Sequence, residues 1–531
     1  MESVKLQNNR RTAYLSVRNV FPVLICLLLS GLFVLLNNYL YQHGFASKIL
    51  LYLGEKTLLT YSGNPPRIEN MGFANPPFPY FFALLFRNPF IATAAVGGTI
   101  ATSILMVLYR AHREKKVSLF LFLLLFAYVT LSPLTLFLLS QQMPTAILIG
   151  LLLLIYHHLY CYCRQDVSYH LFMFGLLSAL LFLTEFQAIF LIPLFTFSLV
   201  SNVIGDKPLM GVSILFTGLF PIVFVAFSWC YLNWLFLGDP FHFISYWSSA
   251  LEPLLSFPDK CVSSQTAYDA LLVAIRLCYK NSLLLMPYYL LVIWVLTSFR
   301  FMKIRDCVTK SILIAPFLLL YVQISTNFVE LNQFFFLSFV VSAVSVRIHL
   351  YEQLQGTFFQ RVFTLSILVS LCVSFWLPFH HSSSEEEIFV EFLSGNETNG
   401  NLNHFRSLIA ELDVDAKILL DDTVNYPLVF LVNNPKRFVL PYEYEFDMVL
   451  SFPVQFVRYV VVSDLSTVDA VQGRYPMAIN GYIPNFSLRG QFQNLFLFEV
   501  SLPANKHKNE DYFRPTRNHL FRSNSITNLL N

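Results

Sequence analysis

One short polar segment carries the side chains best suited to chemistry, and it lies between two long apolar stretches of the chain. It runs from Pro65 to Gly72 and contains Arg67, Glu69 and Asn70. We expect Glu69 to lie at the outer surface of a membrane, where a partly buried carboxylate can act as a general base for an acceptor hydroxyl. A solvated loop glutamate is the plainer alternative. Arg67 can pair with Glu69 or bind a lipid phosphate through its forked donors.

Further polar residues lie where apolar segments are predicted to reach the outer surface. Glu185 interrupts an apolar stretch, and ionisable groups at membrane depth are expensive and usually functional. Asp239 stands between Gly238 and Pro240, a turn signal that leaves two roles open: a helix cap, or a second carboxylate facing a cavity. The predicted substrate-binding residues are Arg67, Asn70, Glu185, Asp239, His242 and Tyr246.

Glu55 is a competing carboxylate in the same predicted loop as Glu69. We interpret Gly54-Glu55-Lys56 as an amphipathic turn at the surface. The sequence predicts no metal site, because the pair Cys161 and Cys163 lacks further ligands and structural zinc needs about four. No cofactor is predicted, although a divalent metal remains open.

The composition of the chain is that of a membrane protein. Of its 531 residues 56% are apolar and only 13% are charged, whereas ordinary soluble domains carry about 25% charged residues. The formal net charge of +3 is too small to indicate a nucleic-acid partner. Most of the chain is therefore predicted to avoid water.

The apolar runs predict a polytopic α-helical membrane protein with about eleven transmembrane helices. The first run, from Val20 to about Leu36, exceeds the roughly 7–15 residues of a signal-peptide core and is read as a retained span. The other spans are predicted near 89–109, 117–139, 144–160, 171–183, 186–200, 210–237, 283–299, 311–325, 334–346 and 362–378.

The distribution of Lys and Arg predicts the orientation, because these residues in short loops favour the cytoplasm. Reading 171–200 as two short helices rather than one long kinked helix places the basic cluster 300–310 inside, together with the basic N-terminus. The N-terminus is then cytoplasmic. The long loops 41–88 and 238–281 and the tail face the outer compartment, which is where chemistry is expected.

The tail is predicted to fold separately from the transmembrane domain 1–380. Residues 381–401 are polar and read as a linker, and 402–531 as a soluble extracytoplasmic α/β domain. No cysteine follows Cys372, so this domain has no disulfide framework. Its predicted strands are Ala416–Leu420, Pro427–Val432, Val457–Val462 and Asn494–Val500, and its predicted helices are 402–412 and 466–473.

Transfer of a sugar from a lipid carrier fits this layout. A polyprenyl-phosphate donor keeps its tail in the bilayer and its phosphate at the outer interface. The leaving group is already anionic, so the protein needs a base for the nucleophile and cations or other donors around the phosphate. A nucleotide site is unnecessary.

The layout resembles the GT-C superfamily of integral-membrane glycosyltransferases, which use polyprenyl- or dolichyl-phosphate sugars. The resemblance is carried by Arg67-Ile68-Glu69-Asn70, by the following Asn75-Pro76-Pro77-Phe78-Pro79, and by the segment Asn233–Phe243. It implies that the first outer loop supplies the catalytic carboxylate, here Glu69. Many members carry two adjacent acidic residues in this loop, whereas Asn70 follows Glu69 here, so the resemblance does not extend to a metal-binding acidic pair.

The predicted function is therefore a membrane glycosyltransferase of the cell envelope, in the inner or plasma membrane or, in a eukaryote, the endoplasmic reticulum. Its predicted partners are a lipid-linked sugar donor and a glycan, lipid or protein acceptor, with no nucleic acid. Two other classes stay open. One is a non-catalytic scaffold whose tail docks a partner. The other is a transporter, which is disfavoured because few charges fall within the predicted spans and no internal repeat is evident.

Overall fold

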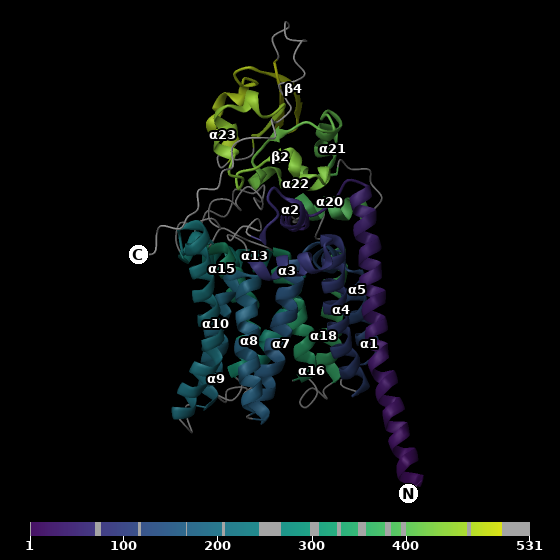
Figure 1. Ribbon diagram of the computed structural model, residues 1–531. Coiled ribbons are helices and arrows are strands. Elements are labelled where there is room, and N and C mark those ends of the chain that lie inside the picture. Colours follow the sequence, from purple (N-terminus) through teal and green to yellow (C-terminus); the bar gives the residue numbers. More distant parts are fainter. Residues whose placement is uncertain are drawn as a thin grey trace.

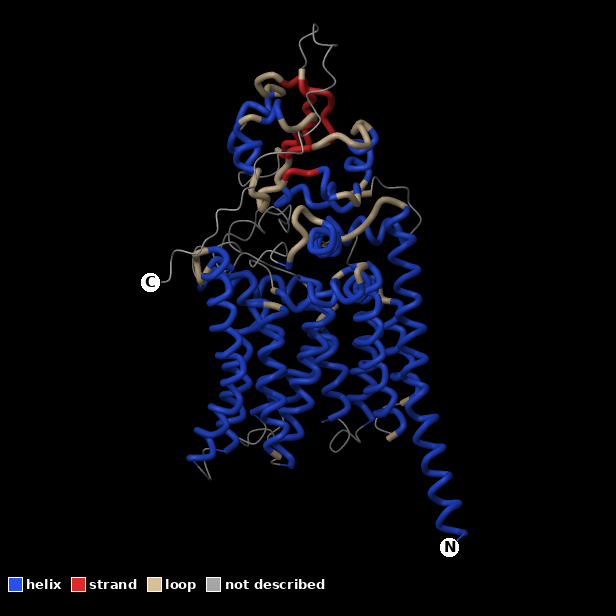
Figure 2. Tube along the Cα trace, in the orientation of Figure 1, coloured by secondary structure: helices blue, strands red, loops and turns tan. Residues whose placement is uncertain are grey.

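The chain folds into a helical bundle with a small α/β domain at one end (Figure 1). The computed structural model describes residues 2–68, 76–114, 118–165, 167–203, 208–243, 267–297, 307–325, 331–348, 357–376, 384–393, 400–464 and 469–501. The N-terminus of α1 lies at the end of the bundle opposite to this α/β domain (Figures 1 and 2).

The bundle and the segments around it are helical throughout the described residues. The helices are α1 (Glu2–Gln42), α2 (Lys48–Ser62), α3 (Pro77–Phe86), α4 (Pro89–Arg113), α5 (Leu119–Leu131), α6 (Pro133–Gln141), α7 (Met143–Gln165), α8 (Ser168–Thr184), η2 (Phe186–Phe190), α9 (Leu191–Val203), α10 (Pro208–Leu237), α13 (Ala267–Lys280), α14 (Met286–Thr297), α15 (Cys307–Ser325), α16 (Leu331–Ile348), α18 (Thr357–Trp376) and α20 (Ser384–Leu393).

The prediction of eleven spans is wrong. Four helical stretches among the described residues are long and apolar enough to cross a membrane, namely Phe21–Gln42, Pro89–Arg113, Met143–Cys163 and Gly211–Leu237. A fifth is possible if α5 and α6, which meet at a 52° bend, form one broken span. These helices are compatible with an integral membrane protein.

Breaks within apolar runs explain the lower number of spans. The predicted span 117–139 is interrupted at Ser132-Pro133, where proline removes a backbone donor and ends α5. The stretch 171–200 contains two separate helices, as predicted, with the 3₁₀ turn η2 between them. The break at Ser132-Pro133 was not predicted from the apolar composition. Several other predicted spans correspond to apolar helices of 10–17 residues, which are too short to count as spans.

The C-terminal domain is a five-stranded sheet with helices. Its strand order is β2-β1-β3-β5-β4, with β2, β1 and β3 parallel and β5 and β4 antiparallel. Its elements are α21 (Asn403–Ala410), β1 (Ile418–Leu419), α22 (Asp422–Val432), η5 (Pro435–Arg437), β2 (Phe438–Val439), α23 (Phe446–Ser451), η6 (Pro453–Gln455), β3 (Tyr459–Ser463), α24 (Ala470–Arg474), η7 (Pro476–Asn480), β4 (Phe486–Phe492) and β5 (Leu495–Val500). Apolar side chains form a core on each face of the sheet.

Most predicted elements of this domain are confirmed. The strands expected at Ala416–Leu420 and Asn494–Val500 contain β1 and β5, and the strand expected at Val457–Val462 overlaps β3. The helix predicted at 402–412 contains α21, and the helix predicted at 466–473 overlaps α24. The strand predicted at Pro427–Val432 is wrong, because α22 occupies it. Asp421 caps that helix by accepting a hydrogen bond from the Thr423 amide at 2.8 Å, a local signal that outweighs the strand-like composition.

The segment between the bundle and the sheet is a layer formed mainly by the first loop. Helices α2 and α20 lie between the helices of the bundle and α22 (Figures 1 and 2). α20 falls within the stretch that was predicted to be a linker, and its Phe389 is buried against Phe45 and Phe137.

A buried polar network fastens this layer to the bundle. Gln141, at the end of α6, accepts a hydrogen bond from the Ser47 amide at 3.0 Å, and its carbonyl accepts one from the Ser47 hydroxyl at 2.8 Å. Its side-chain amide donates to Asn37 Oδ1 on α1 at 2.8 Å. Because Ser47 also caps α2, one glutamine sets where α2 begins relative to α1 and α6.

Replacing Gln141 with Leu should therefore destabilise the fold by about 1–3 kcal/mol, since buried polar groups at Ser47 and Asn37 lose their partner. Thermal unfolding in detergent should show a lower melting temperature. The matched control is Gln142→Leu at the neighbouring half-buried position, which should have a smaller effect. An equal loss in both variants would contradict this role of Gln141.

Candidate functional site

The structure gives some of the predicted site residues a position. Glu69, Asn70 and Tyr246 lie outside the described residues. Arg67 donates to the Tyr442 carbonyl at 3.1 Å and to the Tyr444 hydroxyl at 3.2 Å, with its guanidinium 5.2 Å from the centre of the Tyr444 ring. Arg67 therefore binds the C-terminal domain.

Three other predicted residues, Glu185, Asp239 and His242, follow the ends of α8 and α10, two helices that pack against each other. Glu185 follows α8 and is buried. Asp239 follows α10, and its carboxylate accepts a hydrogen bond from the Phe241 amide at 2.9 Å, which is the capping role left open by the sequence. The residues next to Glu185 and His242 are in contact, because the ring centres of Phe186 and Phe243 are 4.7 Å apart.

The surface assignment of Glu55 is wrong. Glu55 is fully buried, where α2 packs against α22 of the C-terminal domain. The Lys56 ammonium lies 3.2 Å from a Glu55 carboxylate oxygen and 2.6 Å from an Asp422 carboxylate oxygen. The structure thus forms a buried cluster of two carboxyls and one ammonium between the first loop and the tail.

Helix α2 is buried on both sides, which explains why its amphipathic pattern misled the prediction. Leu53 belongs to the core of the bundle, whereas Leu59 belongs to the core of the C-terminal domain. At Gly54 the two parts approach so closely that a Cβ atom would lie 2.6 Å from the Phe430 ring of α22 and 3.0 Å from Pro89. An amphipathic helix predicts one buried face but not what covers the other.

Asp422 reaches this cluster because of the topology of the sheet. β1, β2 and β3 are parallel, so their carboxyl ends lie at one edge. Asp421 and Asp422 follow β1, and Glu443 lies a few residues beyond β2. Ligands of open α/β sheets bind outside the carboxyl ends of the strands. In this chain the same edge is turned toward the first loop.

Burial controls the protonation of the cluster. It raises the pKa of Glu55 well above its ordinary value, an effect that Lys56 opposes and Asp422 reinforces. Burial disfavours the charge of Lys56, but the two carboxyls together hold the Lys56 pKa well above its usual range. Burial by itself would raise the pKa of Asp422, but the adjacent Lys56 ammonium outweighs this effect and lowers the pKa below its ordinary value. These shifts favour the charged forms of Lys56 and Asp422 and the protonated form of Glu55.

Two other carboxyls of the same sheet edge have raised pKa values. Burial raises the pKa of Glu443 to about 7, with Lys417 opposing the shift and Glu445 and Asp422 adding to it. Burial also raises the pKa of Asp469 to about 6, against hydrogen bonds from backbone amides. Despite this gathering of acids, the described residues contain no group of three or more His, Cys, Asp or Glu placed to hold a metal ion.

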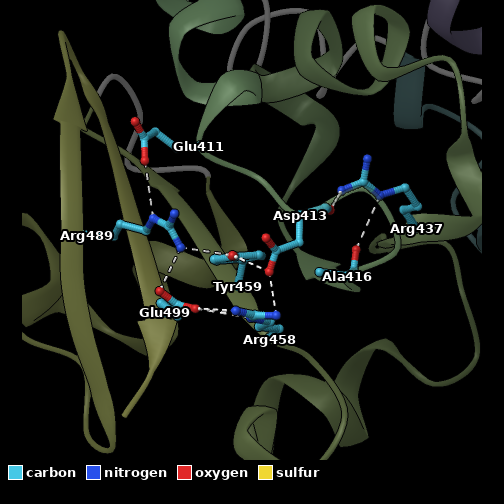
Figure 3. Close-up of polar contacts among 8 residues, drawn as sticks. All are labelled: Glu411, Asp413, Ala416, Arg437, Arg458, Tyr459, Arg489 and Glu499. Atoms are coloured by element: carbon cyan, nitrogen blue, oxygen red, sulfur yellow. Dashed lines mark hydrogen bonds and ion pairs between the residues drawn. The ribbon is translucent and has the colours of Figure 1, made fainter.

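The opposite edge of the sheet carries a different charge cluster (Figure 3). Arg489 lies 2.8 Å from Glu499 and 3.3 Å from Glu411, and Arg458 pairs with Glu499 at 2.9 Å and with Asp413. These side chains are partly or largely exposed, so solvent screens them and they stabilise the domain little. This exposed cluster differs in burial from the cluster around Lys56, which is largely shielded from water.

No protein-family model matches the chain, and no curated protein matches it. Function is therefore inferred from the residues and their geometry. The sequence carries one local signal for the buried cluster, because two acidic residues directly follow a predicted strand of an α/β domain, and ligands of such domains bind outside the carboxyl ends of parallel strands. Asp421 and Asp422 follow the strand predicted at Ala416–Leu420.

Replacing Lys56 with Met should weaken the attachment of the C-terminal domain by about 3–5 kcal/mol, because it leaves buried carboxyls without their cation. The measurement is denaturant unfolding of the full chain in detergent.

A triple variant, Glu55→Leu with Lys56→Met and Asp422→Leu, should lose less than Lys56→Met alone, since apolar replacement of a whole buried ion cluster removes its desolvation cost. Arg489→Met at the exposed edge is the control and should have little effect. If Lys56→Met unfolded like the parent chain, the buried cluster would not hold the two parts together.

Proposed function

We propose that the chain is a membrane glycosyltransferase of the GT-C type, which moves a sugar from a polyprenyl-phosphate carrier to a glycan, lipid or protein acceptor. The observation that carries this proposal is the layer between bundle and tail. The first loop after α1 forms helices α2 and α3, and the α/β domain covers α2 at the same end of the bundle (Figure 1). A reaction at the membrane surface needs such a covered interface.

The proposed catalytic base is Glu69, on the segment between α2 and α3. Two described residues limit where the base can lie. Arg67 is fixed to Tyr442 and Tyr444, and two residues of chain reach at most about 7 Å. Glu69 is therefore proposed to act close to the margin of the C-terminal domain. Arg67 is assigned to holding this loop, instead of the phosphate contact expected from the sequence.

The proposed orientation follows from charge. The basic N-terminal segment is proposed to lie in the cytoplasm. Because the N-terminus of α1 lies at the end of the bundle opposite the C-terminal domain (Figure 1), the face with that domain is proposed to be the outer face. The lipid phosphate would then lie at the outer surface. Glu185 and the turn at Asp239 and His242 are proposed to line the donor side, because they lie together at the ends of α8 and α10.

A non-catalytic scaffold is the second candidate. It is favoured by one observation, the complete burial of Glu55 and the near-complete burial of Lys56 and Asp422. These ionisable residues of the first loop and tail hold the structure together instead of facing a substrate. A scaffold would tolerate loss of Glu69 but not loss of the C-terminal domain.

Replacing Glu69 with Gln should lower sugar transfer by about 100-fold or more, since a positioned general base contributes about 10²–10⁴ to a rate. The measurement is mass spectrometry of the lipid fraction from cells that lack the chain and are complemented with each variant. Lipid-linked sugar donor should accumulate in cells with Glu69→Gln and in cells without the chain.

Two controls accompany this experiment. Glu445→Gln changes an exposed glutamate of the C-terminal domain and should restore normal lipid levels. Equal amounts of each variant in the membrane should be verified by immunoblotting. Normal consumption of the donor by Glu69→Gln would remove Glu69 as the base, and unchanged lipids in cells without the chain would favour the scaffold.

A further inference from the structure

We infer that Glu55, Lys56 and Asp422 form a proton-dependent latch, which holds the C-terminal domain on α2 and releases it when the proton on Glu55 is lost. The latch rests on geometry that is independent of any reaction. Its consequence for transfer, through the loop that follows α2, rests on the proposed glycosyltransferase function.

The first step is a count of buried charge. With a proton on Glu55 the cluster contains one ammonium and one carboxylate, and its net charge is zero. When that proton passes to solvent, two carboxylates face one ammonium. An unmatched charge in a buried site is strongly unfavourable unless water reaches it. Separation of α2 from α22 is the simplest way to admit water, because the cluster lies between them.

Within the part of the chain that the structure describes, Lys56 is the cation recorded beside Glu55. The ionisable groups that face it are Lys56 on its own helix, Asp422 and Tyr426 on α22, Tyr80 on α3, and Tyr442 beyond β2. Arg437 lies on η5, which also packs on α2, but it donates to the carbonyls of Asp413 and Ala416. The basic residues of α4 are in its last turn, whereas its first residue, Pro89, is the one near Gly54.

The direction of the pH dependence follows from the pKa shifts. The pKa of Glu55 is raised on docking. Its contribution to the stability of docking is therefore fully present at acidic pH and is lost as the pH rises through the raised pKa. The pKa of Asp422 is lowered, so its contribution is lost as the pH falls below its usual range. Docking should therefore be strongest between these limits.

The latch is connected to the rest of the first loop. Before α2, the Asn401 side chain donates to the Ala46 carbonyl at 2.7 Å, and the Leu402 amide donates to the Gly44 carbonyl at 2.9 Å. After α2, Arg67 binds the segment beyond β2. The tail thus contacts the first loop before α2, at α2 itself and after α2. Opening of the latch frees the contact at α2 and thereby weakens the attachment of the C-terminal domain to the first loop, to which the proposed base Glu69 belongs.

The test is hydrogen exchange of the full chain in lipid nanodiscs, measured across pH and corrected for intrinsic exchange rates. Protection of the backbone amides of α22 reports docking. In the parent chain, protection should fall about tenfold for each pH unit above the pKa of Glu55. Glu55→Gln keeps the neutral form at every pH and should abolish this fall. Asp422→Asn should show low protection across the whole range.

Two control variants separate the latch from other titrating groups. Glu443→Gln removes the carboxyl whose pKa is about 7 and should retain the pH profile of the parent chain. Arg489→Met at the exposed edge should retain it as well. An unchanged pH-dependent fall in Glu55→Gln, or its loss in Glu443→Gln, would overturn the proposal.

The readout does not depend on sugar transfer, so the two proposals can fail separately. A pH-dependent latch in a chain without transferase activity would leave the latch standing and remove the glycosyltransferase. Full transfer activity together with pH-independent protection of α22 would support the glycosyltransferase proposal and overturn the latch.

Discussion

The ammonium of Lys56, held between the carboxyls of Glu55 and Asp422, is the interaction on which the arrangement of the two domains depends. It joins a helix of the first loop to the start of α22, more than three hundred residues later in the chain. A buried ion cluster of this kind adds little stability over apolar packing but is very intolerant of losing one member. It therefore specifies one docked arrangement in preference to others.

This interaction changes how the tail is understood. A soluble domain joined to a membrane bundle by a polar linker would be free to move, whereas the segment 384–393 is helix α20 and packs against the first loop. The carboxyl edge of the sheet, where α/β domains commonly bind ligands, is directed at α2. The tail is thus part of the covered interface in which we propose that sugar transfer takes place.

The two edges of the sheet show that burial determines how strongly a charge affects stability. Arg489, Arg458 and their carboxylate partners form more ion pairs than Lys56 does, but they are screened by water. At the other edge a single ammonium serves two carboxyls out of water, so one proton decides the net charge. Only this second edge can respond sharply to protonation.

The sequence by itself determined that the chain has long apolar helices compatible with a membrane protein, and it determined the α/β tail and three of its strands, because composition and β-branched runs report burial locally. It did not determine the number of spans, since the apolar run 117–139 was taken as one span although Ser132-Pro133 breaks it into α5 and α6. It also placed Glu55 at the surface. Only the tertiary structure covers the second face of α2 and brings Asp422 to Lys56, because that contact depends on the parallel topology of β1 and on how the tail docks.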